Sequence, residues 1–99
     1  MMPSRAIEAT VRGLVQGVGF RWFVSREADI ARVTGWVANQ PDGSVALVAE
    51  GDADDVDALI AALRQGPPGA MVSSVIVHDR IPSGSFSRFE IRSGAHRGD

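Results

Sequence analysis

Cysteine and lysine are both absent from this sequence of 99 residues. Without cysteine, disulfide frameworks, thiolate zinc sites and cysteine nucleophiles are excluded together. Without lysine, Schiff-base chemistry and the lysine of a P-loop are excluded as well, and all 10 basic residues are arginine. Packing must therefore stabilise the fold, and any cationic site must use arginine.

Long apolar runs are also missing, since no stretch approaches the roughly 18 residues of a transmembrane helix. The first ten residues lack the apolar region of a secretory signal peptide. We therefore expect a cytoplasmic location and no contact with a membrane. The net charge of −2 gives too little basic excess for a general binder of polyanions, so we expect no nucleic-acid partner.

The length of the chain suits one hydrophobic core. A chain of this size buries roughly 60 to 70% of its unfolded surface when it folds. The sequence shows no internal repeat, linker or low-complexity segment. We expect a single domain over 1–99, with an ordered core at about 5–92 and a flexible tail at 93–99. We also expect a monomer.

Apolar periodicity predicts an alternating order of strands and helices. The predicted strands cover 5–15, 33–40, 44–51, 71–81 and 86–92. Helical spacing begins at Phe20, and a second helix is expected between Asp52, which can cap it, and Gly66, which ends it. The order βαββαβ plus a short closing strand predicts an α+β, ferredoxin-like sandwich. Its antiparallel sheet carries two helices on one face.

This topology predicts which segments share a site. In such a sandwich the third strand lies between the first two and runs antiparallel to both, so the first two strands end at the same edge. The loop after the first strand should therefore lie near Asn39, two strand spacings or roughly 10 Å away. The third strand begins with Gly43 and Ser44, whose small size we expect to leave room for a ligand.

The loop GLVQGVGFRW, residues 13–22, holds three glycines, no acid and no hydroxyl. Glycine permits positive φ, so successive backbone N–H groups can turn inward, and the following helix adds its unpaired N–H groups. Arg21, in the first helical turn, can reach back over the loop and bind two phosphate oxygens with its planar fork. This composition indicates a phosphate cradle. From these residues alone, a plain strand-to-helix turn with a solvated Arg21 is an equally good interpretation.

Two motifs resemble the signatures of the acylphosphatase family. GLVQGVGFR, residues 13–21, matches the first signature, and GWVANQPDGSVALVAEG, residues 35–51, matches the second at its glycine, aromatic, Val, Asn, Gly, Val and final Gly positions. The resemblance covers roughly residues 7 to 92 and implies the same ferredoxin-like fold. It implies an acyl phosphate as small-molecule substrate, hydrolysed to a carboxylate and inorganic phosphate, and we expect phosphate to be both product and inhibitor.

The resemblance also implies roles for individual residues. Arg21 corresponds to the phosphate-binding arginine, and Asn39 to the residue that holds the attacking water. The residues that would supply backbone N–H donors are Gln16, Gly17, Val18, Gly19 and Phe20. Ala38 stands where relatives often carry arginine or lysine, and Ala46 replaces a frequent acid, so we expect the charge near the site to differ.

The chemistry of this substrate explains why a catalytic histidine is not needed. The leaving group is a carboxylate with a pKa of about 4 to 5, so its departure needs no general acid. Phosphoryl transfer mainly needs positioning and charge stabilisation, which Arg21 and N–H groups supply, while Asn39 can orient water without adding charge. We therefore expect a hydrolase with no metal and no cofactor. The alternative is a noncatalytic phosphate-ligand or protein-interaction module on the same fold.

Other residues are expected to be structural. The aromatic side chains that could stack on nucleic-acid bases are Trp22, Phe23 and Trp36. We expect them to pack in the core, because no basic strand with aromatic residues accompanies them. His78 and His96 have no second ligand at metal spacing, so surface positions are expected. The acidic run 52–55 lacks the ligand spacing of a calcium loop and is expected to begin a helix.

Overall fold

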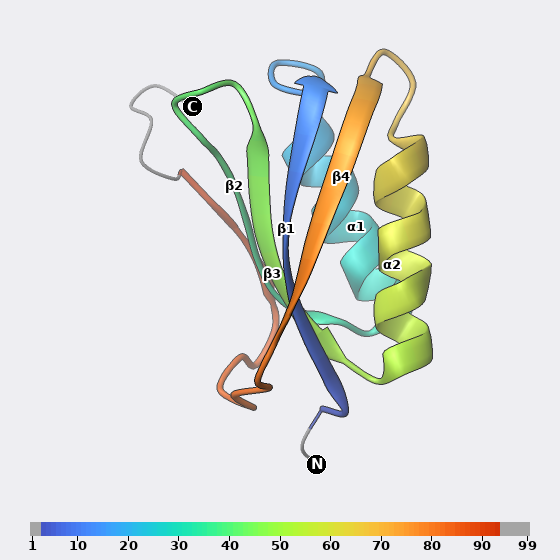
Figure 1. The fold of residues 1–99 in the computed structure, drawn as a ribbon, viewed down its shortest axis with the longest axis vertical. Coiled ribbons are helices and arrows are strands. Elements are labelled where there is room, and N and C mark those ends of the chain that lie inside the picture. Colours follow the sequence, from blue (N-terminus) through green and yellow to red (C-terminus); the bar gives the residue numbers. More distant parts are fainter. Residues whose placement is uncertain (1–2, 94–99) are drawn as a thin grey trace.

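The computed structural model describes residues 3–93. Its elements are β1 (Arg5–Leu14), α1 (Phe20–Ala31), β2 (Thr34–Asn39), β3 (Val45–Gly51), α2 (Ala53–Gln65), β4 (Met71–Arg80) and β5 (Phe89–Arg92). Both helices lie on the same side of one twisted sheet (Figure 1), which confirms the predicted ferredoxin-like α+β sandwich. In the described part of the chain, no helix is long and apolar enough to cross a membrane. Of the tail expected at 93–99, residues 94–99 lie outside the described residues.

The strand order is β4-β1-β3-β2-β5. β1 pairs antiparallel with β3 and β4, and β2 pairs antiparallel with β3. The closing strand differs from the expectation, because β5 pairs parallel with β2 and makes the sheet mixed. The reason is visible in Figure 1: segment 81–88 crosses one end of the sheet from β4 to β2, so the chain returns in the direction of β2. β5 also begins at Phe89, three residues later than predicted.

The core lies between the sheet and the two helices. Strand alternation brings Ile7 and Val11 of β1 to the helix side, and helical spacing turns Val24 of α1 and Leu59 of α2 toward them. Each such buried side chain contributes about 1.5 to 3 kcal/mol relative to an exposed one. Phe20, the first residue of α1, is buried in the same cluster. The end of the glycine loop is therefore anchored in the core.

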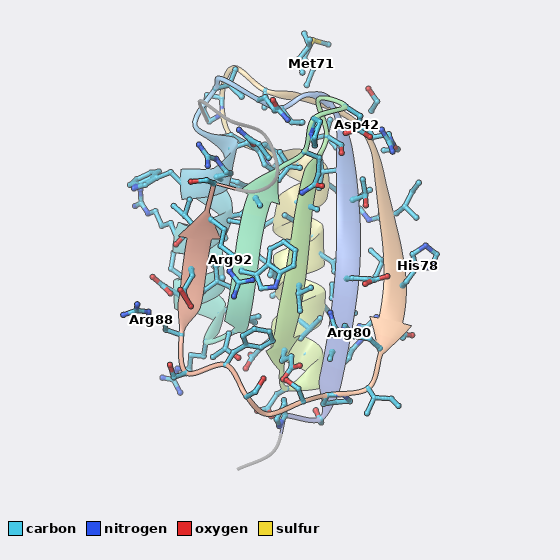
Figure 2. The ribbon with its side chains drawn as sticks, turned by 90° about the vertical axis from the view of Figure 1, so that its left-hand side faces the viewer. Asp42, Met71, His78, Arg80, Arg88 and Arg92 are labelled. Atoms are coloured by element: carbon cyan, nitrogen blue, oxygen red, sulfur yellow. The ribbon has the colours of Figure 1, made fainter. Side chains whose placement is uncertain are left out.

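The expected core packing of both tryptophans is wrong. Trp22 is 62% exposed, because the α1 positions that face the sheet are Phe20 and Val24. Trp36 alternates with the core residue Val37, which places Trp36 on the helix-free face of the sheet. There the guanidinium of Arg92 stacks over the Trp36 ring, 5.1 Å from its centroid. Figure 2 shows the Arg92 side chain lying across the middle of this face.

Phe23 and His78 lie where the sequence predicts them, whereas the expectation for Asp52 is only partly met. Phe23 packs against the core, with its ring centroid 5.9 Å from that of Phe20. His78 is exposed on β4, as expected. Asp52 occupies the N-cap position of α2, but the predicted side-chain cap is wrong, because Ser4 Oγ instead accepts the Ala53 N–H at 3.0 Å.

Glu50 is a buried carboxylate, 1% exposed, that holds the crossing segment 81–88 against the sheet. It accepts hydrogen bonds from the Ser83 N–H (2.9 Å), the Ser83 hydroxyl (2.8 Å) and the Gly84 N–H (2.9 Å). Burial alone would raise the pKa of Glu50, but these hydrogen bonds and the charge of Arg80 outweigh it and lower the pKa. The carboxylate therefore stabilises the fold at neutral pH, and this contribution is lost as the pH falls through the folded-state pKa.

We expect Glu50→Gln to lower the free energy of unfolding by about 1 to 3 kcal/mol at neutral pH, because an amide nitrogen replaces one acceptor oxygen. The difference from wild type should begin to narrow below the ordinary glutamate pKa of about 4.3, where the unfolded chain takes up the proton, and should close as the pH falls through the lowered folded-state pKa. Urea unfolding at neutral and acidic pH measures both values. Glu8→Gln, which changes an exposed carboxylate, is the control. A difference that stays the same at both pH values would contradict this role of the charge.

Candidate active site

The loop between β1 and α1 coils tightly through two glycines. Gly17 has φ 75° and Gly19 has φ 77°, both in the left-handed region. A Cβ at either position would meet no heavy atom within 4 Å. Glycine is therefore required by the left-handed backbone conformation and not by a lack of space. The open space beside these two residues leaves their backbone accessible to a ligand.

α1 begins without a side-chain cap. Gly19 is its N-cap residue, no capping hydrogen bond from a side chain is found among the described residues, and the first turn holds no acid. The first N–H groups of a helix have no partner within it and carry a partial positive charge. α2 differs, because Asp54 and Asp55 lie in its first turn. Of the two helix starts, that of α1 is therefore the one suited to an anion.

Arg21 is held at this helix start by the main chain of β5. Its Nη1 donates a hydrogen bond to the Arg92 carbonyl oxygen at 3.0 Å. Arg92 is the last residue of β5 and is the register partner of Ala38, the residue before Asn39. A guanidinium has five N–H donors in one plane. The hydrogen bond to the Arg92 carbonyl therefore fixes the orientation of the planar Arg21 guanidinium beside the end of β2.

Asn39 is the last residue of β2 and faces the helix side, because Val37, two residues earlier, lies in the core. It is 7% exposed and pairs in register with Val45 of β3. Its backbone is therefore held in the sheet, while its side chain lies near the start of α1. A neutral amide in this position can both accept and donate hydrogen bonds.

Arg21 and Asn39 line one cavity of about 190 Å³. The described residues that line it are Val15, Gly17, Gly19, Phe20, Arg21, Trp22, Asn39 and Ile91. The structure therefore brings together the glycine loop, the first turn of α1 and the ends of β2 and β5. None of the described residues that line this cavity is acidic. That Arg21 binds phosphate and Asn39 binds water stays a prediction at this point.

Two of the predicted loop residues lie outside this lining. The Gln16 side-chain amide donates to the carbonyl oxygens of Gln40 (2.8 Å) and Ser44 (2.9 Å), which ties the loop to the β2–β3 turn. Val18 packs against the core. The side chains of both residues therefore stabilise the loop, and only their backbone groups could contact a ligand.

Gly43 and Ser44 do not line the cavity, so the expectation that they leave room for a ligand there is wrong. They close the β2–β3 turn, in which the Ser44 hydroxyl and N–H donate to Asp42 at 2.6 and 3.0 Å. These two hydrogen bonds, with that of Arg12 at 3.1 Å, lower the pKa of Asp42 to about 2. The small residues Gly43 and Ser44 therefore serve a tight turn in which Asp42 accepts hydrogen bonds from Ser44.

Two other cavities suit an anion less well. One of about 290 Å³, at the Glu50 end of the sheet, is lined by three acidic residues, Glu50, Asp52 and Asp55, against one basic residue, Arg32, so its net charge repels a dianion. The other, of about 260 Å³, lies on the helix-free face around Trp36, where the acidic Glu8 stands beside Arg80 and no helix start supplies N–H donors from the described residues. Among residues 3–93, no group of three His, Asp or Glu side chains is placed to hold a metal ion. The cavity at the start of α1 is therefore the candidate active site.

Ala38 and Ala46 are register partners on β2 and β3. Alternation puts Ala38 on the helix-free face, whereas its neighbour Asn39 faces the cavity. The two departures from the family pattern therefore lie at one place, on the opposite side of the sheet from the candidate site. Neither residue lines the cavity.

Sequence reasoning missed Ile91, Trp22 and the Arg92 carbonyl as parts of this site. Ile91 and Arg92 reach it because β5 pairs parallel with β2, a pairing that short apolar segments do not specify. The position of Trp22 beside the site could have been predicted, because Trp22 directly follows Arg21 on a helix whose buried stripe consists of other residues.

Comparisons with known proteins agree with the two motifs. The acylphosphatase family model matches residues 7–91. The chain is 46% identical over 87 residues to an acylphosphatase of Methylococcus capsulatus. The aligned region covers 88% of this chain and 95% of that protein. A solved acylphosphatase from Coxiella burnetii has a TM-score of 0.85 and 41% identity, covering 89% and 92% of the two chains. One from Bacillus subtilis has a TM-score of 0.86 and 36% identity, covering 89% and 98%.

Proposed function

This chain belongs to the acylphosphatase family and is an enzyme that hydrolyses acyl phosphates, and we propose that it does so in the cavity at the start of α1. Arg21 and the loop 16–20 hold the phosphate, and Asn39 positions the attacking water. The observation that carries this proposal is the shared lining: an uncapped helix start, an arginine and a neutral amide surround one small cavity, and none of its lining residues within 3–93 is acidic.

Phosphate binding rests on donors that are already in place. Gly17, Gly19 and the first turn of α1 line the cavity, so their backbone N–H groups can donate to a phosphate bound there. Arg21 adds a full charge, and its fork can bind the Arg92 carbonyl and phosphate oxygens at the same time. Hydrogen bonds to charged groups contribute about 1.5 to 3 kcal/mol each, so four or five offset much of the desolvation of a dianion.

The chemical step needs little from the protein beyond position and charge. A water attacks phosphorus, the bond from phosphorus to the acyl oxygen breaks, and the carboxylate leaves with the electron pair. Both hydrogens of the water stay on the phosphate, so the products are a carboxylate and dihydrogen phosphate. Asn39 Oδ1 accepts a hydrogen bond from the water and thereby aims it, while Arg21 and the N–H groups stabilise charge on the equatorial oxygens.

Further properties follow as proposals from this arrangement. We also propose that the enzyme is a monomer with one domain over 1–99. Since the cavity holds the phosphate end of the substrate, inorganic phosphate should inhibit by competing for it. The cytoplasmic location stays a prediction.

Release of phosphate from benzoyl phosphate and acetyl phosphate, measured with a metal chelator present, tests the proposal. We expect turnover at the same rate with and without the chelator, because leaving group and charge stabilisation need no metal. Loss of activity in the chelator would contradict the metal-independent mechanism. Phosphate binding without any turnover would support the noncatalytic module instead.

A further inference from the structure

We propose that Trp22 and Ile91 bind the acyl group of the substrate and make this enzyme select aromatic or other bulky apolar acyl phosphates. The inference rests on the proposed function, because it assumes that the phosphate end occupies the cavity beside Arg21. It adds a substrate class and the two residues that determine it.

The size of the cavity leaves the acyl group at its mouth. At about 190 Å³ the cavity is smaller than the roughly 300 to 1,000 Å³ of sites that enclose drug-sized ligands. The donors that suit a phosphate, Arg21 and the start of α1, belong to its lining, so the phosphate end fills the polar part. The rest of the substrate must then contact the apolar residues at the rim.

Two large apolar side chains from different elements form that rim. Trp22 of α1 is 62% exposed and Ile91 of β5 is 45% exposed, and both line the cavity. Single exposed apolar residues are common and need no function. Here, however, segments far apart in the sequence bring two of them to the lining of the cavity that also holds Arg21 and Asn39.

The indole ring of Trp22 is held in place by its own helix. The guanidinium of Arg26, one turn later in α1, lies 5.4 Å from the ring centroid. This contact restrains the ring while the side chain still borders the cavity. A restrained aromatic surface loses little conformational entropy when an aromatic acyl group packs against it.

Trp22→Ala tests the inference, with Trp22→Phe as the conservative variant and Ile30→Ala as the control. Ile30 is also in α1 and is 69% exposed, but it does not line the cavity. The measurement is kcat/KM for benzoyl phosphate and for acetyl phosphate, together with the inhibition constant of inorganic phosphate. Thermal melting checks that each variant is folded.

We expect Trp22→Ala to reduce the ratio of kcat/KM for benzoyl phosphate to that for acetyl phosphate about tenfold, mainly through KM for benzoyl phosphate. Trp22→Phe should keep most of the preference, and Ile30→Ala should leave both substrates and phosphate inhibition unchanged. An unchanged ratio in Trp22→Ala, or an equal loss on both substrates, would overturn the inference. Failure of the proposed function would look different, since the wild type would then hydrolyse neither substrate or would not be inhibited by phosphate.

Discussion

Arg21→Lys is expected to raise the inhibition constant of inorganic phosphate by about 10- to 100-fold, although the charge is kept. The planar guanidinium can bind the Arg92 carbonyl and phosphate oxygens together, because its donors lie in one plane at fixed angles. The compact ammonium of lysine cannot match this two-sided geometry. The value of kcat/KM for an acyl phosphate should fall at least as far, since the same contacts stabilise the charge of the transition state.

Arg64→Lys is the matched control for this variant. Arg64 lies in the last turn of α2 and does not line the cavity, so phosphate inhibition should stay at the wild-type value. An unchanged inhibition constant in Arg21→Lys would show that Arg21 does not contact the phosphate.

Asn39→Ala is expected to lower kcat by about 100-fold or more, because the water loses the group that aims it at phosphorus. Asn39 is nearly buried at the end of β2, so we expect the loss of its amide to lower the free energy of unfolding by about 1 to 3 kcal/mol as well. Thermal melting must therefore accompany the kinetics. Thr34→Val, at the opposite end of β2, changes a half-buried polar residue away from the cavity and should leave kcat unchanged.

A folded Asn39→Ala variant with the kcat of the wild type would exclude the water-positioning role. A variant that is unfolded at the assay temperature would point to Asn39 as a residue that braces the β2–β3 hairpin.

The sequence predicted the sandwich because its strongest signals are periodic. Alternation in β1 and helical spacing in α1 place Ile7 and Val24 on facing surfaces, and burial of these residues fixes how the layers pack. The closing strand was predicted less well. Its four residues are too few to show a register, and its direction depends on how Glu50 holds the crossing segment 81–88.

The candidate site was also predicted in part, where local motifs and topology determine it. Arg21 and Asn39 stand within motifs, and the βαββαβ topology alone requires β1 and β2 to end at the same edge of the sheet. The brace from Gln16 to the β2–β3 turn depends on side-chain geometry that no local pattern encodes. Ile91 reaches the cavity through the parallel pairing of β5 with β2, a contact between distant segments.

In the proposed mechanism, Arg21 holds the phosphate and Asn39 positions the water. The inhibition constant of inorganic phosphate for the folded Asn39→Ala variant, set beside its kcat, tests this division most directly. We expect an inhibition constant within about twofold of the wild type while kcat falls about 100-fold. An inhibition constant that rises in step with the loss of kcat would contradict it, because Asn39 would then be one more phosphate ligand.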